Sequence, residues 1–199
     1  MSLANYSDLK TSVATWLNRS DLSGAIPDFI AIAEAKLSRV LKCRQMDAET
    51  VLTTTQGNPL VALPSDLTAI KSVQQAGGDY PPMEYMTPDA FRAHWAMAKT
   101  GTPGIYTIIA NDLKVAPTPD AAYSIDLTYR MRIPALSDGS PTNWLLTLYP
   151  DAYLYGSLIG AQPFLMNDER LPVFQALFQQ AVDEINGVDW NAAGPLVMR

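Results

Sequence analysis

The sequence predicts an α+β fold: a helical bundle built from the N- and C-terminal helices, an inserted antiparallel β subdomain and an extended C-terminal tail. Apolar residues recur every three to four positions near both ends of the chain, which is typical of helices that bury one face. Between Asp47 and Pro141 the apolar period changes to two, as in half-buried strands. The predicted limits are 1–46 with 141–187 for the bundle, 47–140 for the β-rich insertion and 188–199 for a C-terminal arm.

Two helices are expected in the N-terminal part. The first begins after Asn5, a good N-cap, and ends in the turn-forming residues 18–24. The second begins near Pro27, because proline is tolerated in a first helical turn, and its apolar stripe extends to Leu41. Its basic residues fall roughly opposite the stripe and are interpreted as a solvated face, with a phosphate contact as the alternative. They are Lys36, Arg39, Lys42 and the neighbouring Arg44.

Two more helices are expected in the C-terminal part. The segment that Pro150 opens is apolar nearly all round, so it should be buried in a core or between subunits, and Pro163 should kink or break it. Residues 167–169 are expected to cap the last helix. Its apolar stripe extends from Leu171 to Ile185, and the helix is expected to end at 186–187, where glycine readily takes the left-handed conformation.

The middle of the chain predicts strands. The clearest is 123–133, where odd positions are apolar and even positions polar. Shorter candidates are 49–54, 60–63, 69–75, 105–109 and 113–116. Turn residues separate them at 56–59, 77–79, 111–112 and 117–120. A short helix is expected from Thr87, as N-cap, and Pro88 to about Ala98.

Composition narrows the possible chemistry. The chain has 199 residues, with 20 acidic and 14 basic side chains and a net charge of −6, which argues against a wide phosphate-binding surface. One cysteine, Cys43, and one histidine, His94, can form neither an internal disulfide nor a Cys/His zinc site, and both are interpreted as packing or surface residues. No Gly-rich phosphate loop, membrane span or secretion signal is recognised. The sequence therefore predicts an intracellular protein without a cofactor.

Two carboxylate pairs are candidates for catalysis, and one tyrosine near two arginines is a candidate for nucleic-acid binding. The pairs Asp168/Glu169 and Asp183/Glu184 are sequence neighbours on helices, whose side chains do not face each other, so they do not predict catalysis. Tyr129, near Arg130 and Arg132, could stack a nucleic-acid base, but strand alternation places the tyrosine opposite the arginines. No active site is predicted.

The C-terminal segment is more apolar than a frayed end usually is. It carries Trp190 and, after a Gly-Pro pair, the residues Leu196, Val197, Met198 and Arg199. Two interpretations stay open: the segment packs back on its own domain, or it docks into a groove or sheet edge of a neighbouring protein.

Several short motifs, taken in order, resemble the head-to-tail adaptor proteins of tailed bacteriophages, also called connector or head-completion proteins. They are YSDLK at 6–10, WLNRSDL at 16–22, IPDFI at 26–30, LPSDL at 63–67, GTP at 101–103, PTNWLL at 141–146, YPDAYLYG at 149–156 and NDER at 167–170. The resemblance covers nearly the whole chain. Gln162-Pro163 departs from it, because an unbroken helix is expected there.

The resemblance implies a structural virion protein of the phage neck, assembled in the bacterial host cytoplasm, and not an enzyme. Its subunits would form a closed ring, a dodecamer, that docks on the portal, extends the DNA channel and offers a platform to the next tail or neck protein. Genomic DNA would pass through the lumen without sequence-specific binding, and no membrane is involved. Portal contacts are expected at Trp190, Leu196, Val197, Met198 and Arg199, and subunit contacts at Tyr153, Tyr155, Leu158 and Phe164.

Two other classes were considered: a small carboxylate-based phage hydrolase and a nucleic-acid-binding accessory factor. The first needs two converging acids, and the second needs a basic surface. Residues 134–199 hold two basic and seven acidic side chains, so most of the acidic excess lies in the C-terminal part. In an adaptor ring, acidic walls would let the DNA slide by repelling its phosphates.

Overall fold

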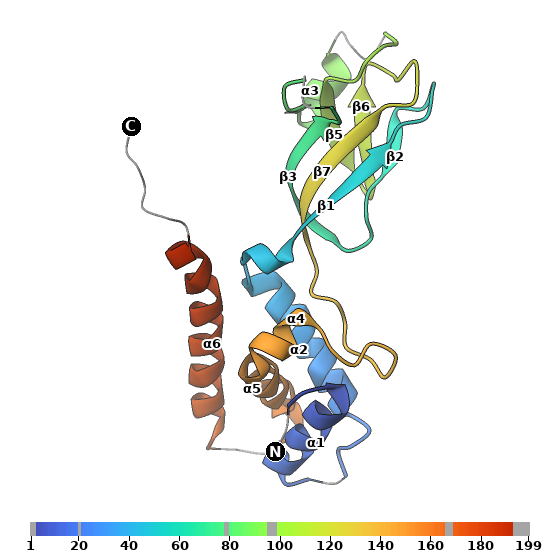
Figure 1. Ribbon diagram of the computed structural model, residues 1–199. Helices are drawn as coiled ribbons and strands as arrows, with labels where there is room; N and C mark the ends of the chain where they lie inside the picture. The colour runs from blue at the N-terminus through green and yellow to red at the C-terminus, as the bar shows by residue number, and fades with distance from the viewer. Residues whose placement is uncertain (1–2, 20, 78–79, 95–98, 166–168, 193–199) are drawn as a thin grey trace. The chain divides into compact units, whose positions relative to one another are not determined.

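The computed structural model describes residues 3–19, 21–77, 80–94, 99–165 and 169–192, and for 189–192 the backbone alone. The chain divides into two compact units, one made of Met1–Met46 and Ile133–Arg199 and the other of Asp47–Arg132. The first unit is helical and the second is rich in strands (Figure 1). The predicted α+β class is therefore confirmed.

Two helices open the helical unit. Helix α1 (Tyr6–Leu17) begins where expected, because the side chain of Asn5 accepts a hydrogen bond of 3.0 Å from the backbone N–H of Asp8. It ends at Asn18, which takes the left-handed conformation with φ of 51°. Helix α2 (Ile26–Val40) has Pro27 in its first turn and buries the predicted stripe. A 3₁₀ turn (Arg44–Met46) then leads into the strands.

The returning chain adds three helices. These are α4 (Trp144–Leu148), α5 (Pro150–Gly160) and α6 (Leu171–Ala192). Helix α5 ends before Pro163, which lies in a 3₁₀ turn (Gln162–Phe164), as the sequence predicts. Helix α4 was not predicted from the sequence. The side chain of Asn143 caps it by accepting a hydrogen bond of 2.8 Å from the N–H of Leu146.

Helix α6 corrects a prediction. The sequence places its end at 186–187, yet the helix continues through Gly187 to Ala192. Asn186 is held at the end of helix α2. Its side-chain oxygen accepts a hydrogen bond of 2.8 Å from the N–H of Lys42, and its amide donates a hydrogen bond of 3.4 Å to the carbonyl of Val40. The tertiary contact overrides the local stop signal. The predicted cap at 167–168 lies outside the described residues.

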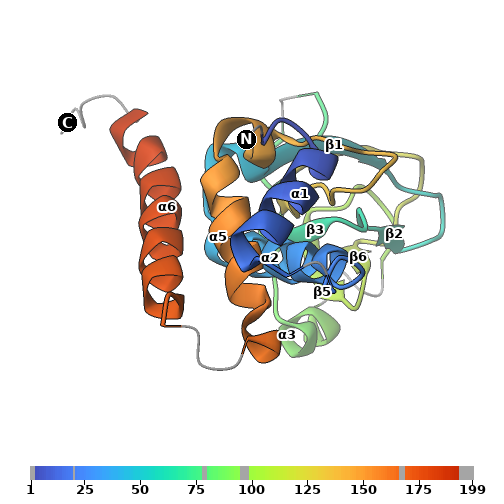
Figure 2. The same cartoon turned by 90° about the horizontal axis from the view of Figure 1, so that it is seen from below.

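Helix α5 lies at the centre of the helical unit, and Figure 2 shows it between α6 and the pair α1 and α2. Two glycines bring its backbone close to both neighbours. A Cβ at Gly156 would lie 3.0 Å from the Cβ of Ala33 and 3.0 Å from the ring of Phe178. A Cβ at Gly160 would lie 3.2 Å from the carbonyl oxygen of Phe29. The five helices share one buried core, to which Ile133 and Leu136 also contribute.

The second unit packs two sheets face to face (Figure 1). One has the order β1-β7-β3 and is antiparallel; the other has the order β2-β6-β5-β4, in which β4 is parallel to β5. The strands are β1 (Asp47–Thr53), β2 (Leu60–Ala62), β3 (Leu67–Gln75), β4 (Glu84–Tyr85), β5 (Ile105–Ile109), β6 (Asp112–Ala116) and β7 (Ser124–Met131). The core between the sheets includes Val73, Leu113 and Leu127.

The strand predictions hold except in three details. The two-residue strand β4 was missed. The turn between β5 and β6 lies at Ala110-Asn111, one residue before the prediction, and Ala110 has φ of 54°. Helix α3 (Pro88–Ala93) is shorter than expected, because His94 already has an extended backbone with ψ of 136°. Phe91 of this helix packs with Ile105 and Ala116 in a small separate cluster.

Candidate functional site

Side chains that ligate metals are not clustered in the described part of the chain. No three His, Cys, Asp or Glu side chains in this described part gather as metal ligands would. Cys43 is buried in the helical unit, and His94 follows α3 in the other unit. Both were predicted to have packing or surface roles.

The acidic pair on α6 does not converge. The carboxylate of Asp183 accepts a hydrogen bond of 2.9 Å from the amide of Gln179, and that of Glu184 accepts 2.8 Å from the amide of Gln180. Each acid is therefore held by a residue one turn earlier on its own side of the helix. Glu169 is exposed, and Asp168 lies outside the described residues. The convergence that a glycosidase requires is not present in this pair.

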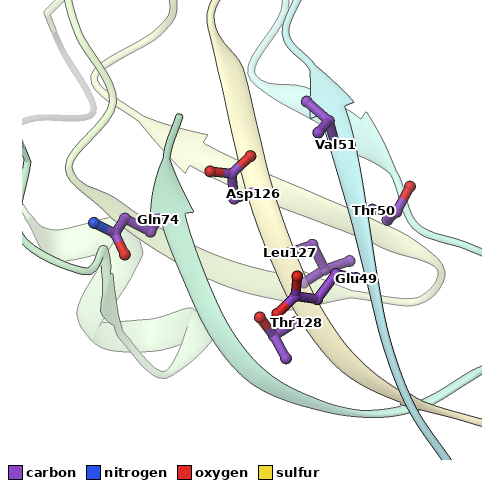
Figure 3. Close-up of a pocket in the computed structure, with 7 residues that line it drawn as sticks. All are labelled: Glu49, Thr50, Val51, Gln74, Asp126, Leu127 and Thr128. Atoms are coloured by element: carbon purple, nitrogen blue, oxygen red, sulfur yellow. The ribbon is translucent and has the colours of Figure 1, made fainter. Parts of the chain in front are cut away.

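A hollow in the β unit lies over the outer face of the sheet β1-β7-β3 and has a volume of about 410 Å³ (Figure 3). Its lining consists of Glu49, Thr50, Val51, Gln74, Asp126, Leu127 and Thr128. Strand register sets this arrangement, because Glu49 is opposite Thr128, and Asp126 lies between Val51 and Gln74. The lining has two carboxylates, Glu49 and Asp126, two threonine hydroxyls and no cationic side chain, so it is rich in hydrogen-bond acceptors.

A smaller hollow of about 240 Å³ is lined by Gln75, Tyr80, Pro81, Pro82, Met83, Thr102, Pro103 and Gly104. Buried Gln75 donates a hydrogen bond of 2.9 Å from its side-chain amide to the carbonyl of Pro103. That bond fixes the loop before β5 against the end of β3. Its role is structural.

Tyr129 is not available to stack a base. Its ring is buried in the sheet core, and its hydroxyl donates 3.2 Å to a carboxylate oxygen of Asp66. Arg132 is exposed and Arg130 is half-buried. The alternation that separates the tyrosine from the arginines is confirmed.

The basic residues of α2 are spread over more than one environment. The ammonium of Lys36 lies 4.5 Å from the ring centre of Phe178, where a cation–π contact covers the core edge. Arg39, Lys42 and Arg44 are exposed. Exposure of these three residues agrees with the interpretation of a solvated helix face.

A buried polar network joins three segments of the helical unit. One carboxylate oxygen of Glu34 on α2 accepts two hydrogen bonds. One comes from the N–H of Leu136, at 2.8 Å, and the other from the hydroxyl of Tyr153 on α5, at 3.1 Å. Asn143 donates from its amide to that hydroxyl at 2.6 Å and to the carbonyl of Pro134 at 2.7 Å. Burial raises the pKa of Glu34, against the lowering effect of the hydrogen bonds that it accepts. The pKa of Tyr153 is also raised, mainly by burial and to a smaller extent by the neighbouring carboxyl group of Glu34.

The four predicted subunit-contact residues separate into two pairs. Tyr153 and Leu158 are both 0% exposed, because they pack in the chain's own core, where a neighbouring subunit cannot touch them. Tyr155 is half-buried beside Trp16, with ring centres 6.2 Å apart, and Phe164 is 49% exposed. Tyr155 and Phe164 are therefore the two predicted contact residues that solvent reaches in the single chain.

The predicted portal contacts lie almost wholly outside the described residues. Leu196, Val197, Met198 and Arg199 are among those left undescribed, and of Trp190 only the helical backbone is described. The structure adds exposed apolar residues that sequence reasoning missed. Ile32, Val173 and Val188 are the clearest on the long helices, and their positions off the buried stripes are the signal that could have found them.

Comparison with known proteins identifies the relatives of this chain. None of its described helices is long and apolar enough to cross a membrane.

A search of curated proteins gives no match. A family model described as "SU10 adaptor protein" matches residues 4–199, which include both structural units. The chain therefore belongs to the SU10 adaptor family of phage structural proteins.

Proposed function

We propose that this adaptor forms a closed ring of identical subunits, a dodecamer by analogy, between the capsid and the tail. The ring docks on the portal, extends the DNA channel and provides the platform for the next tail or neck protein. The observation that carries the proposal is the family match over residues 4–199, because a match across both units concerns the whole chain and not one shared domain. We infer a structural role and not an enzymatic one.

The proposed ring places two demands on the chain. Neighbouring subunits need accessible apolar side chains, and half-buried Tyr155 within α5 and exposed Phe164 in the following 3₁₀ turn are available for this. The lumen must let DNA slide, and the net charge of −6 supports a channel that does not bind phosphate. A strongly positive lumen in the assembled ring would contradict the second point.

The C-terminal arm is proposed to bind the portal through Trp190, Leu196, Val197, Met198 and Arg199. Because α6 extends to Ala192, a chain that stops after Ala192 loses Leu196, Val197, Met198 and Arg199 but keeps the complete helix with Trp190. We expect this variant to lose binding to portal-bearing particles, measured by co-sedimentation, while its unfolding temperature stays unchanged. Trp190→Ala in the full chain separates the contribution of the indole.

A matched control replaces Leu196, Val197 and Met198 by serine and keeps the length of the chain. If the truncated and serine variants still co-sediment with portal particles as the full chain does, the arm does not bind the portal. If the full chain is monomeric in all conditions and never joins portal particles, the ring proposal itself fails.

A further inference from the structure

One side of α6 carries exposed valines near its two ends, with the polar residues Gln180 and Glu184 between them. Val173 is 56% exposed and Val188 is 42% exposed, Leu177 is half-buried, and Glu184 is exposed. These residues follow one another by four, seven and four positions, so they lie on one side of the helix. A rise of 1.5 Å per residue makes this row of residues about 22 Å long. We call Val173, Leu177, Glu184 and Val188 the α6 face.

Helix α2 carries a second exposed face, with the opposite charge at its end. Ile32 is 54% exposed, and Ala31, Ala35 and Arg39 are exposed beside it. The spacing again places these four residues on one side of the helix. Isoleucine is a costly residue to leave in water, since its full burial is worth about 2 kcal/mol. We call Ala31, Ile32, Ala35 and Arg39 the α2 face.

The α6 face cannot reach the α2 face of its own chain. Asn186, which binds the end of α2, marks the side of α6 that is directed toward α2. Glu184 precedes Asn186 by two residues, which places it roughly 160° away around the helix. Within the chain, Glu184 instead accepts its hydrogen bond from Gln180. The two faces are therefore separate surfaces of one helical unit.

We infer that the α6 face of one subunit docks on the α2 face of the next, with Glu184 beside Arg39 and Leu177 against Ile32, because each apolar residue precedes the charged residue of its own helix by seven positions. This inference rests on the proposed ring and names its contact. Two different, complementary faces on one chain are what a head-to-tail interface requires, and such contacts form a ring when the rotation closes. The opposite charges set the register, and burial of Leu177 and Ile32 supplies the attraction.

The test reverses each charge separately. Arg39→Glu places an acid against Glu184 of the neighbour, and Glu184→Arg places a base against Arg39 of the neighbour. We expect each variant to need at least about tenfold more protein to assemble, because like charges then meet across the contact. Assembly is measured by mass photometry in solution and by the number of adaptor copies bound per portal particle.

Mixing the two variants is the decisive arm of the experiment. In an equimolar mixture an alternating ring has an opposite-charge pair at every contact, so assembly should return to the wild-type level. An ion pair within one chain would not be restored by mixing. A ring that assembles normally from either variant alone, or a mixture that stays unassembled, overturns the inference.

A matched pair of substitutions, each of which places an aspartate at an exposed apolar position, tests the apolar part. Ile32→Asp should impair assembly, whereas Leu148→Asp on α4, also an exposed apolar position, should not. Unfolding temperatures close to wild type show that the helical unit stays folded. If the wild-type chain assembles by neither measurement, the proposed ring fails; if it assembles and these variants also do, only the contact is wrong.

Discussion

At the scale of single residues, the buried carboxyl group of Glu34 controls how the returning chain is held. It is the shared acceptor for the backbone of Leu136 and the hydroxyl of Tyr153, which belong to segments far from α2 in the sequence. A buried acceptor that loses its donors costs about 1–3 kcal/mol. The contact therefore fixes the segment that leads from the β unit back into the helices.

The raised pKa of Glu34 gives this contact a pH dependence. A carboxyl group with a raised pKa holds its proton more tightly in the folded protein than in the unfolded chain. Its contribution to stability is present below its ordinary value of 4.5 and is lost as the pH rises through the folded-state pKa. Glu34→Gln keeps the accepting oxygen and removes the charge. We expect the free energy of unfolding of this variant, measured with urea, to fall less than that of wild type as the pH rises above 4.5.

The control is Glu49→Gln on β1, because Glu49 is exposed. This variant should follow the wild-type pH dependence closely. If Glu34→Gln and wild type lose stability in parallel over this pH range, burial of the carboxyl group is not the cause of the loss.

At the scale of secondary-structure elements, α5 depends on glycine to fit between α2 and α6. A methyl group at Gly156 would be compressed between Ala33 and Phe178 from two sides, so neither neighbour can yield toward free space. We expect Gly156→Ala to lower the free energy of unfolding by about 1–3 kcal/mol, as overpacked core positions do. Thermal and urea unfolding measure this change.

Gly187→Ala in α6 is the matched comparison. Nothing lies within 4 Å of a Cβ at this helical glycine. Alanine there should raise the free energy of unfolding by about 0.5–1 kcal/mol, because it removes the backbone entropy cost of glycine in a helix. Equal effects from the two substitutions would show that helix propensity, and not close packing, dominates at Gly156.

Elements with strong local signals could be predicted from the sequence. Asn5 specifies the start of α1, and the alternation in β7 shows which side chains are buried. Strand β4 and helix α4 have two and five residues, too few for a period to be recognised. The predicted end of α6 was wrong because Asn186 is held by the backbone of Lys42, which lies 144 residues away in the sequence. The exposed apolar residues of α2 and α6 were missed for a related reason. Whether a side chain is buried depends on which helices pack against each other, and that is a long-range property of the fold.

At the scale of the whole molecule, the chain enters and leaves the β unit at one place. Asp47 is paired with Arg130 across the strands β1 and β7. Paired residues in an antiparallel sheet lie about 5 Å apart. We expect that excision of 47–132, with a short Gly-Ser bridge from Met46 to Ile133, leaves a helical protein that unfolds cooperatively, as seen by circular dichroism and heating.

Met46 and Ile133, the two ends that the bridge would join, are both buried in the helical core. Their retention keeps that core complete, and the separate fragment 47–132 should fold as a β protein. A disordered excised chain would show that the helical unit depends on the insertion for its stability.

The origin of the helical unit from both ends of the chain has a consequence for its synthesis. The β unit is a continuous segment and can fold while translation continues. Helices α1 and α2, by contrast, must wait for α5 and α6, which are translated after the β unit. A chain cut short by premature termination or by a protease therefore lacks the helical core and the α6 face together. If the ring forms as proposed, such incomplete chains are left out of it.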